Sequence, residues 1–186
     1  MNIDLKLVLL ASGGGSLASE VMKNYGKNIL ALISDRDCPA IYLANQYKVE
    51  SEIIQFKEER EIWNQDLIDA VGKYKPDLVV SVGFMRILSS KFIATFPTIN
   101  THPAYLPNFP GAHAVRDALV AGAKTTGCTV HWVDEGVDTG EIIDQVEIPI
   151  VPGENESQLH ERIKILERKL IVDTIAKLNS NQSWRR

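Results

Sequence analysis

The chain has 186 residues, 45% of them hydrophobic, and a formal net charge of -4. This length suffices to bury one core and is short for two independent domains, so we expect a single domain over residues 1–186. The acidic balance gives no general attraction for nucleic acid or an anionic membrane, and no segment resembles a signal peptide or a membrane span. Any phosphate recognition must therefore be local. The only two cysteines, Cys38 and Cys128, form no CxxC pair or metal-ligand series, which predicts reduced thiols in a cytoplasmic protein.

Apolar segments of strand length recur along the chain, bounded by turn residues, at 5–11, 29–34, 50–54, 78–82, 98–102, 126–133 and 142–150. Segments with helical periodicity separate the early ones, at 16–25, 40–47 and 58–74. In the third of these helices, the residues at spacings that build one apolar face are Ile62, Leu67, Ile68 and Val71. This alternation predicts a Rossmann-like α/β fold, with right-handed crossovers and a mainly parallel twisted sheet covered by helices on both faces.

The last two apolar stretches have no helix between them and are joined only by the Asp- and Gly-rich residues 134–140. We therefore expect a C-terminal antiparallel hairpin added to the sheet. A long helix at 157–178 then closes the chain, with an apolar stripe of Leu159, Ile163, Leu166, Leu170, Ile171 and Ile175. In parallel sheets ligands bind beyond the carboxyl ends of the strands, so a site is expected in the segments that follow strands.

The first such segment, Ser12-Gly-Gly-Gly-Ser16, follows the first strand and opens the first helix. Glycines let the backbone approach a ligand, and a helix start presents N–H groups and partial positive charge to an anion. The loop lacks the GxGxxG spacing of a dinucleotide site and the GxxxxGK[ST] of a P-loop, so it suits a single phosphate better than NAD or ATP. We therefore expect a phosphate in the loop at 12–16. The alternative is a flexible turn without a ligand.

The segment Gly-Phe-Met-Arg-Ile-Leu-Ser at 83–89 leaves the fourth strand. Apolar and aromatic side chains in a loop after a strand suggest a planar ligand held by backbone groups. Residue types alone favour the other interpretation, in which the apolar members pack into the core beneath the following helix: Phe84, Met85, Ile87 and Leu88.

Asn100 and His102 lie two positions apart where the fifth strand ends. Side chains at i and i+2 share one face of a strand, so an amide and an imidazole project together. Such a pair can hydrogen-bond a developing oxyanion and move a proton beside it, as acyl transfer requires. Asp138 is the natural third member, because a carboxylate can orient His102 and favour its charged form. The same residues are equally consistent with a polar network that fixes the Pro-rich loop at 103–110.

The other histidines carry a weaker chemical signal. His131 alternates with apolar neighbours and is expected to be a hydrogen-bonded strand residue. His160 is expected on the surface of the last helix, and His113 begins the helix after the Pro-rich loop and is expected to position that loop. A zinc site built from three histidines requires a spacing such as HExxH, which is absent, so no metal is expected.

Four segments together resemble the folate-dependent formyltransferases. They are Gly-Phe-Met-Arg-Ile-Leu-Ser at 83–89, Asn-Thr-His-Pro at 100–103, Leu-Pro-Asn-Phe-Pro-Gly at 106–111, and Thr-Gly-Cys-Thr-Val-His-Trp-Val-Asp-Glu-Gly-Val-Asp-Thr-Gly-Glu-Ile-Ile at 126–143. The Gly-rich loop at 12–16 matches one branch of the family too, so the resemblance covers nearly the whole chain.

The resemblance implies that the primary amine of glycinamide ribonucleotide attacks the formyl carbon of 10-formyltetrahydrofolate, a step of de novo purine biosynthesis. The tetrahedral intermediate needs its oxyanion stabilised, which the resemblance assigns to Asn100 and protonated His102. Asp138 is implied to hold His102 charged and to help relay the proton. Neither a metal nor a covalent intermediate is implied.

Residue by residue, the resemblance puts the substrate phosphate on Gly13, Gly14, Gly15 and Ser16, and the ribose hydroxyls near Glu167. It puts the folate pterin, mainly through backbone contacts, against Met85, Arg86, Ile87, Leu88, Val137 and Thr139. Arg60 aligns with a basic residue that meets the glutamate tail of folate. The implied partners are these small molecules, with no nucleic acid and no membrane, and the protein is expected to be a monomer or a homodimer.

Some positions depart from the family pattern. Leu17 stands where the family usually has Asn, Ala104-Tyr105 replaces the common Ser-Leu, and Ala114 replaces a frequent second His. The rivals on this fold are hydrolysis of formyltetrahydrofolate, formylation of a nucleotide-sugar amine or of methionyl-tRNA, and a silent folate- or nucleotide-binding protein. The hydrolase and the tRNA enzyme normally carry an extra domain, for which this chain has no room. A sugar nucleotide suits a loop for one phosphate poorly.

Overall fold

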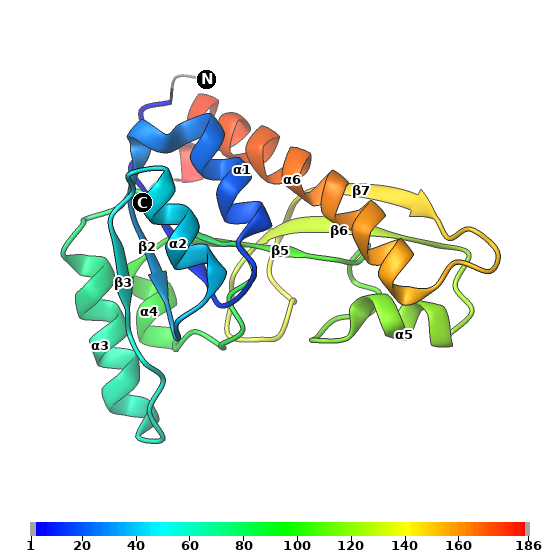
Figure 1. Ribbon diagram of the computed structural model, residues 1–186, viewed down its shortest axis with the longest axis horizontal. Helices are drawn as coiled ribbons and strands as arrows, with labels where there is room; N and C mark the ends of the chain where they lie inside the picture. The colour runs from blue at the N-terminus through cyan, green and yellow to red at the C-terminus, as the bar shows by residue number, and fades with distance from the viewer. Residues whose placement is uncertain (1–2, 185–186) are drawn as a thin grey trace.

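The computed structural model describes residues 3–184. Seven strands form one sheet in the order β3-β2-β1-β4-β5-β6-β7 (Figure 1). The parallel strands are β1 (Leu7–Ala11), β2 (Ile29–Ser34), β3 (Ser51–Ile53), β4 (Leu78–Ser81) and β5 (Thr98–His102). The last two, β6 (Thr125–Trp132) and β7 (Ile142–Pro149), pair antiparallel as a hairpin beside β5. The predicted mainly parallel sheet with an added hairpin is therefore confirmed.

Helices cover both faces of this sheet (Figure 1). One face carries α1 (Ser16–Tyr25), α2 (Pro39–Gln46) and the long α6 (Glu156–Ser180), and the other carries α3 (Arg60–Gly72) and α4 (Ser90–Thr95). The short α5 (Ala114–Val120) follows the loop after β5 and contacts α6. Two single 3-10 turns, Gly26–Asn28 and Gln182–Trp184, are the remaining helical elements of the described residues.

The central strand β1 is buried on both faces. Leu7 and Leu9 belong to the core under α1 and α6, whereas Val8 and Leu10 belong to the core under α3 and α4. All four side chains are completely buried. A parallel strand covered on both sides needs an uninterrupted apolar run instead of an alternating pattern, and β1 has one.

The apolar face predicted for α3 is wrong at one position. Ile62 is 55% exposed, whereas the other predicted members, Leu67, Ile68 and Val71, are buried. Trp63 is the buried residue of that turn, and its indole Nε1 donates a hydrogen bond of 2.9 Å to the Ile54 carbonyl. Tryptophan buries more apolar area than isoleucine and here has a partner for its N–H, so the helix docks with Trp63 inward.

The strand order reverses at β1, whose neighbours are β2 and β4. The loops that follow β1 and β4 therefore diverge toward opposite faces and leave a crevice between them. The Ser12 backbone N–H donates to the Gly83 carbonyl at 3.0 Å and ties these two loops together. β5 ends beside them, so the three loops singled out in the sequence meet at one edge of the sheet. Within residues 3–184, no helix has both the length and the apolar character needed to cross a membrane.

Candidate active site

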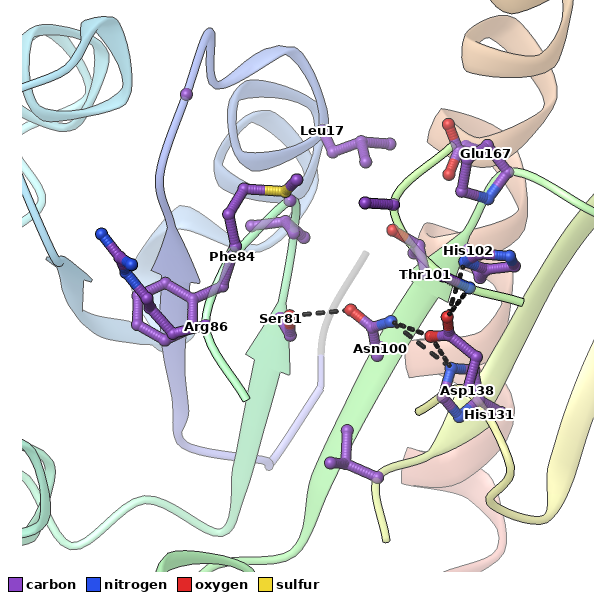
Figure 2. A pocket seen from close by; sticks show the side chains of 18 of the residues that line it. Leu17, Ser81, Phe84, Arg86, Asn100, Thr101, His102, His131, Asp138 and Glu167 are labelled. Carbon is purple, nitrogen blue, oxygen red and sulfur yellow. Dashed lines mark hydrogen bonds and ion pairs between the residues drawn. The ribbon is translucent and has the colours of Figure 1, made fainter. Parts of the chain in front are cut away.

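The carboxyl ends of β1, β4 and β5 open into a cavity of about 520 Å³. The turn of the β6–β7 hairpin and one side of α6 form its other walls. Figure 2 shows the side chains that surround it. A cavity of this size accommodates small organic ligands, and it combines the Gly-rich loop, the loop after β4 and the end of β5 in one site.

Asn100 projects into this cavity from β5 with its amide held in a defined orientation (Figure 2). The Ser81 hydroxyl donates a hydrogen bond of 2.7 Å to Asn100 Oδ1. The amide nitrogen therefore faces the other way, at 3.3 Å from His131 Nε2 and 3.5 Å from Asp138 Oδ1. Asn100 thus presents N–H donors inside the site, which is the requirement for binding a developing negative charge.

His102 is buried and has an acceptor at each ring nitrogen. Its Nδ1 lies 3.2 Å from Asp138 Oδ2, and its Nε2 lies 2.8 Å from the Phe109 carbonyl oxygen. A ring with acceptors on both sides is best satisfied when both nitrogens carry protons. Both acceptors come from residues with left-handed backbone, since Asp138 and Phe109 each have φ of 55°. Such backbone is costly for non-glycine residues and is often found at functional sites.

Asp138 connects His102 with the rest of the cluster. Burial by itself raises the pKa of this carboxyl. Hydrogen bonds from His131 and from the Gly111 N–H, 2.9 Å from Oδ2, together with the charges of the two histidines, outweigh burial and lower the pKa below its ordinary value of 3.8. Asp138 is therefore ionised at neutral pH and stabilises positive charge on a neighbouring imidazole.

His131 is a member of the cluster that the sequence reasoning missed. It lies on β6, as expected, where the strand register places it opposite Asn100. Its Nδ1 donates to the Trp132 carbonyl at 2.8 Å, so its Nε2 is directed at Asn100 and at Asp138 Oδ1, 3.4 Å away. The signal that could have found His131 was the alternation of side chains along β6. A buried polar residue on a hairpin strand can face the same side of the sheet as the neighbouring site.

The Gly-rich loop forms an uncapped helix start. Gly15 is the N-cap of α1, no side chain caps the helix, and its first turn contains no acidic residue. A Cβ added to Gly13 or Gly14 would meet nothing within 4 Å, whereas one on Gly15, whose φ is 73°, would lie 2.8 Å from the Ala40 Cα. The left-handed backbone and the packing on α2 thus require glycine at position 15, whereas Gly13 and Gly14 leave the cavity side open for an anion. Leu17 also lines the cavity and packs on the core.

Three polar residues of α6 line the same cavity at positions i, i+4 and i+7: His160, Lys164 and Glu167. The prediction that His160 lies on the helix surface is wrong, because it is half-buried in the cavity wall; burial and the Lys164 charge lower its pKa. The sequence reasoning missed Lys164, although its helical spacing from Glu167 is the signal that finds it. Glu167 is only 4% exposed, and burial raises the pKa of its carboxyl to about 7 in spite of the nearby Lys164 and Arg168.

For the loop after β4, the prediction that four apolar residues pack into the core is confirmed at two positions and wrong at the other two. Phe84 and Leu88 are buried in the core under α3 and α4, and both also line the cavity. Met85 and Ile87 are 61% and 55% exposed and line the cavity, opposite Val137 of the hairpin turn, which is 50% exposed. Alternate residues of one short loop therefore anchor it and form an apolar wall.

Three residues assigned to folate binding from the sequence have other contacts. The Arg86 guanidinium pairs with the buried Asp35 at 2.6 Å, although the residue also lines the cavity. Arg60 and Thr139 are not among the lining residues. The Arg60 guanidinium donates to the Ile87 carbonyl at 2.6 Å, and the Thr139 hydroxyl donates to Asp134 at 2.8 Å. Across the described part of the chain, no group of three or more His, Cys, Asp or Glu side chains is arranged to hold a metal ion.

Comparison with known proteins gives one consistent result. Residues 5–175 match the family model described as formyl transferase. A phosphoribosylglycinamide formyltransferase of Mycobacterium tuberculosis (strain ATCC 25618 / H37Rv) is 44% identical over 181 residues, which cover 93% of this chain and 84% of the relative. The enzyme of that name from Escherichia coli (strain K12) is 30% identical and covers 97% of this chain and 93% of its own. The crystal structure of phosphoribosylglycinamide formyltransferase from Streptococcus pneumoniae TIGR4 superposes with a TM-score of 0.89 at 32% identity, over 94% of this chain and 98% of that one.

Proposed function

Because this chain belongs to the formyl transferase family, we propose that it transfers the formyl group of 10-formyltetrahydrofolate to the primary amine of glycinamide ribonucleotide. One observation carries the proposal: a helix start suited to a phosphate and the cluster of Asn100, His102 and Asp138 open into the same cavity. A phosphorylated amine bound at the first feature has its reactive end near the second. Residues 1–186 would act as a single domain on small-molecule substrates.

The reaction forms one bond and breaks one. The amine nitrogen attacks the formyl carbon, the bond between that carbon and the folate nitrogen breaks, the amine loses a proton and the folate nitrogen gains one. His102 is the proton carrier, because it is the imidazole whose Nδ1 faces an ionised carboxylate at 3.2 Å. Asp138 keeps the ring oriented and favours its charged form, as the carboxylate of a catalytic triad does.

The oxyanion that develops on the formyl group needs donors that are already in place. Ser81 fixes the Asn100 amide so that its N–H groups face the site. In the protein alone, His102 Nε2 donates to the Phe109 carbonyl. An oxyanion that replaces this carbonyl as the acceptor receives a stronger hydrogen bond, since both partners are then charged.

The ribonucleotide side of the site is the Gly-rich loop together with α6. The phosphate binds the backbone N–H groups of Gly13, Gly14, Gly15 and Ser16 at the uncapped start of α1. Lys164 adds a positive charge from the facing helix. Glu167, whose pKa is about 7, can accept and donate hydrogen bonds and is suited to ribose hydroxyls.

The folate side is the wall formed by the loop after β4 and the hairpin turn. Met85, Ile87 and Val137 are at least half exposed in the protein alone and face the cavity, so a planar pterin would cover them. Leu88 also lines the cavity, and the remaining contacts would be made by backbone groups of residues 85–88 and 137–139. Arg60, exposed and bonded to the Ile87 carbonyl of this loop, would meet the carboxylates of the glutamate tail.

The direct test mixes the protein with 10-formyltetrahydrofolate and glycinamide ribonucleotide and follows tetrahydrofolate by absorbance. We expect turnover that requires both substrates, with formylglycinamide ribonucleotide as the second product. Release of tetrahydrofolate without the amine would identify a hydrolase. Binding of both ligands without turnover would identify a silent binding protein, and either result would overturn the proposal.

A further inference from the structure

The loop at residues 83–88 presents apolar side chains to solvent and contains no helix or strand. Met85 and Ile87 are more than half exposed, so burial of these two side chains does not hold the loop in place. A loop without its own hydrogen-bonded structure needs anchors from other parts of the chain if it is to be ordered before a ligand arrives. Its conformation therefore depends on the buried side chains of Phe84 and Leu88 and on polar contacts made behind the apolar wall.

Asp35, just after β2, is the centre of these contacts. Its side chain is completely buried and accepts a hydrogen bond of 2.6 Å from Arg86 Nε. Arg36 supplies a second guanidinium, whose Nη2 lies 2.7 Å from Asp35 Oδ2; the Arg36 side chain is 44% exposed. The Arg86 guanidinium also lies 3.9 Å from the centre of the Phe56 ring, and the Phe56 N–H donates to the Asp35 carbonyl at 3.1 Å. Asp35 and Arg86 are thus held together by further contacts with Arg36 and Phe56.

Ser12 provides a second route from Asp35 to the same loop. The Met85 N–H donates to the Ser12 hydroxyl oxygen at 2.9 Å, and the same hydroxyl stabilises the ionised Asp35 carboxylate, which lowers the pKa of Asp35. Burial raises the pKa of Asp35, but hydrogen bonds from Arg36, Ser12 and Arg86 together lower it to about 2. The carboxylate is therefore charged at neutral pH, where it holds the Arg86 side chain directly and the Met85 N–H by way of Ser12.

We propose that Asp35 is a positioning residue for the folate side of the site, holding residues 83–88 in the conformation that receives the pterin through Arg86 and the Ser12 hydroxyl. Asp35 does not line the cavity, so it acts on the ligand only through this loop. The inference rests on the proposed function in one respect, namely that the ligand at this wall is the formyl-folate. The anchoring of the loop itself does not depend on the ligand.

The test compares Asp35→Asn, Arg86→Met and Arg86→Lys with the control Arg36→Gln, which removes the exposed guanidinium and leaves the loop contact intact. We expect Asp35→Asn and Arg86→Met to raise the KM for 10-formyltetrahydrofolate about tenfold or more, since each breaks a buried hydrogen bond between charged groups. The KM for glycinamide ribonucleotide should stay within about twofold, as should both constants in the control. Arg86→Lys, which keeps the charge, should recover part of the loss.

Hydrogen exchange of the Met85 amide in the protein without ligands gives a readout independent of activity. We expect faster exchange in Asp35→Asn than in the parent, with the amides of β1 unchanged. This measurement decides the anchoring even if the parent transfers no formyl group, so failure of the proposed function and failure of the inference are distinguishable. If Asp35→Asn does not fold, Arg86→Met carries the same expectations, because its side chain is 27% exposed and tolerates replacement better.

Two results would overturn the inference. One is an unchanged folate KM together with unchanged exchange at Met85 in both variants. The other is an equal rise of the KM for both substrates, which a purely structural role of Asp35 produces and a role specific to the folate wall does not.

Discussion

The substitution Asp138→Asn tests the centre of the proposed mechanism with little change in shape. Asparagine has the size of aspartate and tolerates the left-handed backbone that Asp138 adopts at φ of 55°. His102 also keeps its contact with the Phe109 carbonyl at 2.8 Å, so the ring stays in the site. The variant therefore removes the negative charge and leaves the geometry of the site intact.

The expected magnitude follows from the contacts that lose this charge. Asp138 lies 3.2 Å from His102 Nδ1 and 3.4 Å from His131 Nε2, and its side chain is only 13% exposed. Loss of one hydrogen bond between charged groups corresponds to about 10- to 100-fold. Proton transfer by a positioned imidazole contributes roughly 10²- to 10⁴-fold, part of which is lost when the introduced amide favours the neutral ring. We expect kcat to fall by about 10²- to 10⁴-fold.

The assay is steady-state formation of tetrahydrofolate with each substrate varied in turn. The KM for glycinamide ribonucleotide should stay within about threefold, because the Gly-rich loop follows β1, whereas the polar partners of Asp138 are Asn100, His102, Gly111 and His131. Glu135→Gln is the matched control, an identical loss of charge at an exposed position of the same hairpin turn. A folded Asp138→Asn protein with kcat within about threefold of the parent would refute the reasoning, as would an equal loss in the control.

Three further predictions concern the ribonucleotide side. Gly15→Ala should lower the free energy of unfolding by about 1–3 kcal/mol, because of its φ of 73° and the 2.8 Å approach of an added Cβ to α2. Gly14→Ala, with open space around it, should unfold at nearly the parental denaturant concentration, and equal losses in the two variants would contradict the role given to Gly15. Lys164→Gln should raise the KM for the ribonucleotide about tenfold at constant kcat, whereas the exposed Lys169→Gln should change neither; a loss confined to kcat would argue against phosphate binding. Because the pKa of Glu167 is about 7 against an ordinary 4.5, the folded state holds its proton longer than the unfolded state, so stability falls by up to roughly 3 kcal/mol as pH rises through this interval. Glu167→Gln should remove that slope and raise Tm at pH 8 while weakening ribonucleotide binding. If thermal unfolding of the variant at pH 5 and 8 matches the parent, Glu167 is not the group whose titration lowers the stability.

Most of the fold follows from local pattern. The apolar runs and the helical spacings predict each strand and the helices α1, α2, α3 and α6, because backbone geometry imposes a period of two on strands and 3.6 on helices. Ile62 is the exception, since two neighbouring large residues both fit the helical spacing and only packing on the sheet decides that Trp63 is the buried one. The loop at 83–88 is similar, because composition alone does not say which of its apolar residues face inward.

The sequence by itself determined that Asn100 and His102 share a face, since the alternation of a strand requires it, and that an anion would find free N–H groups after β1. Only the tertiary structure decided which partners these groups have. The hairpin register brings His131 opposite Asn100, and the turn that follows directs Asp138 to His102. The docking of α6 brings Lys164 and Glu167 to the cavity. Contacts between residues far apart in the chain depend on register and packing of the whole sheet, and no local periodicity encodes them.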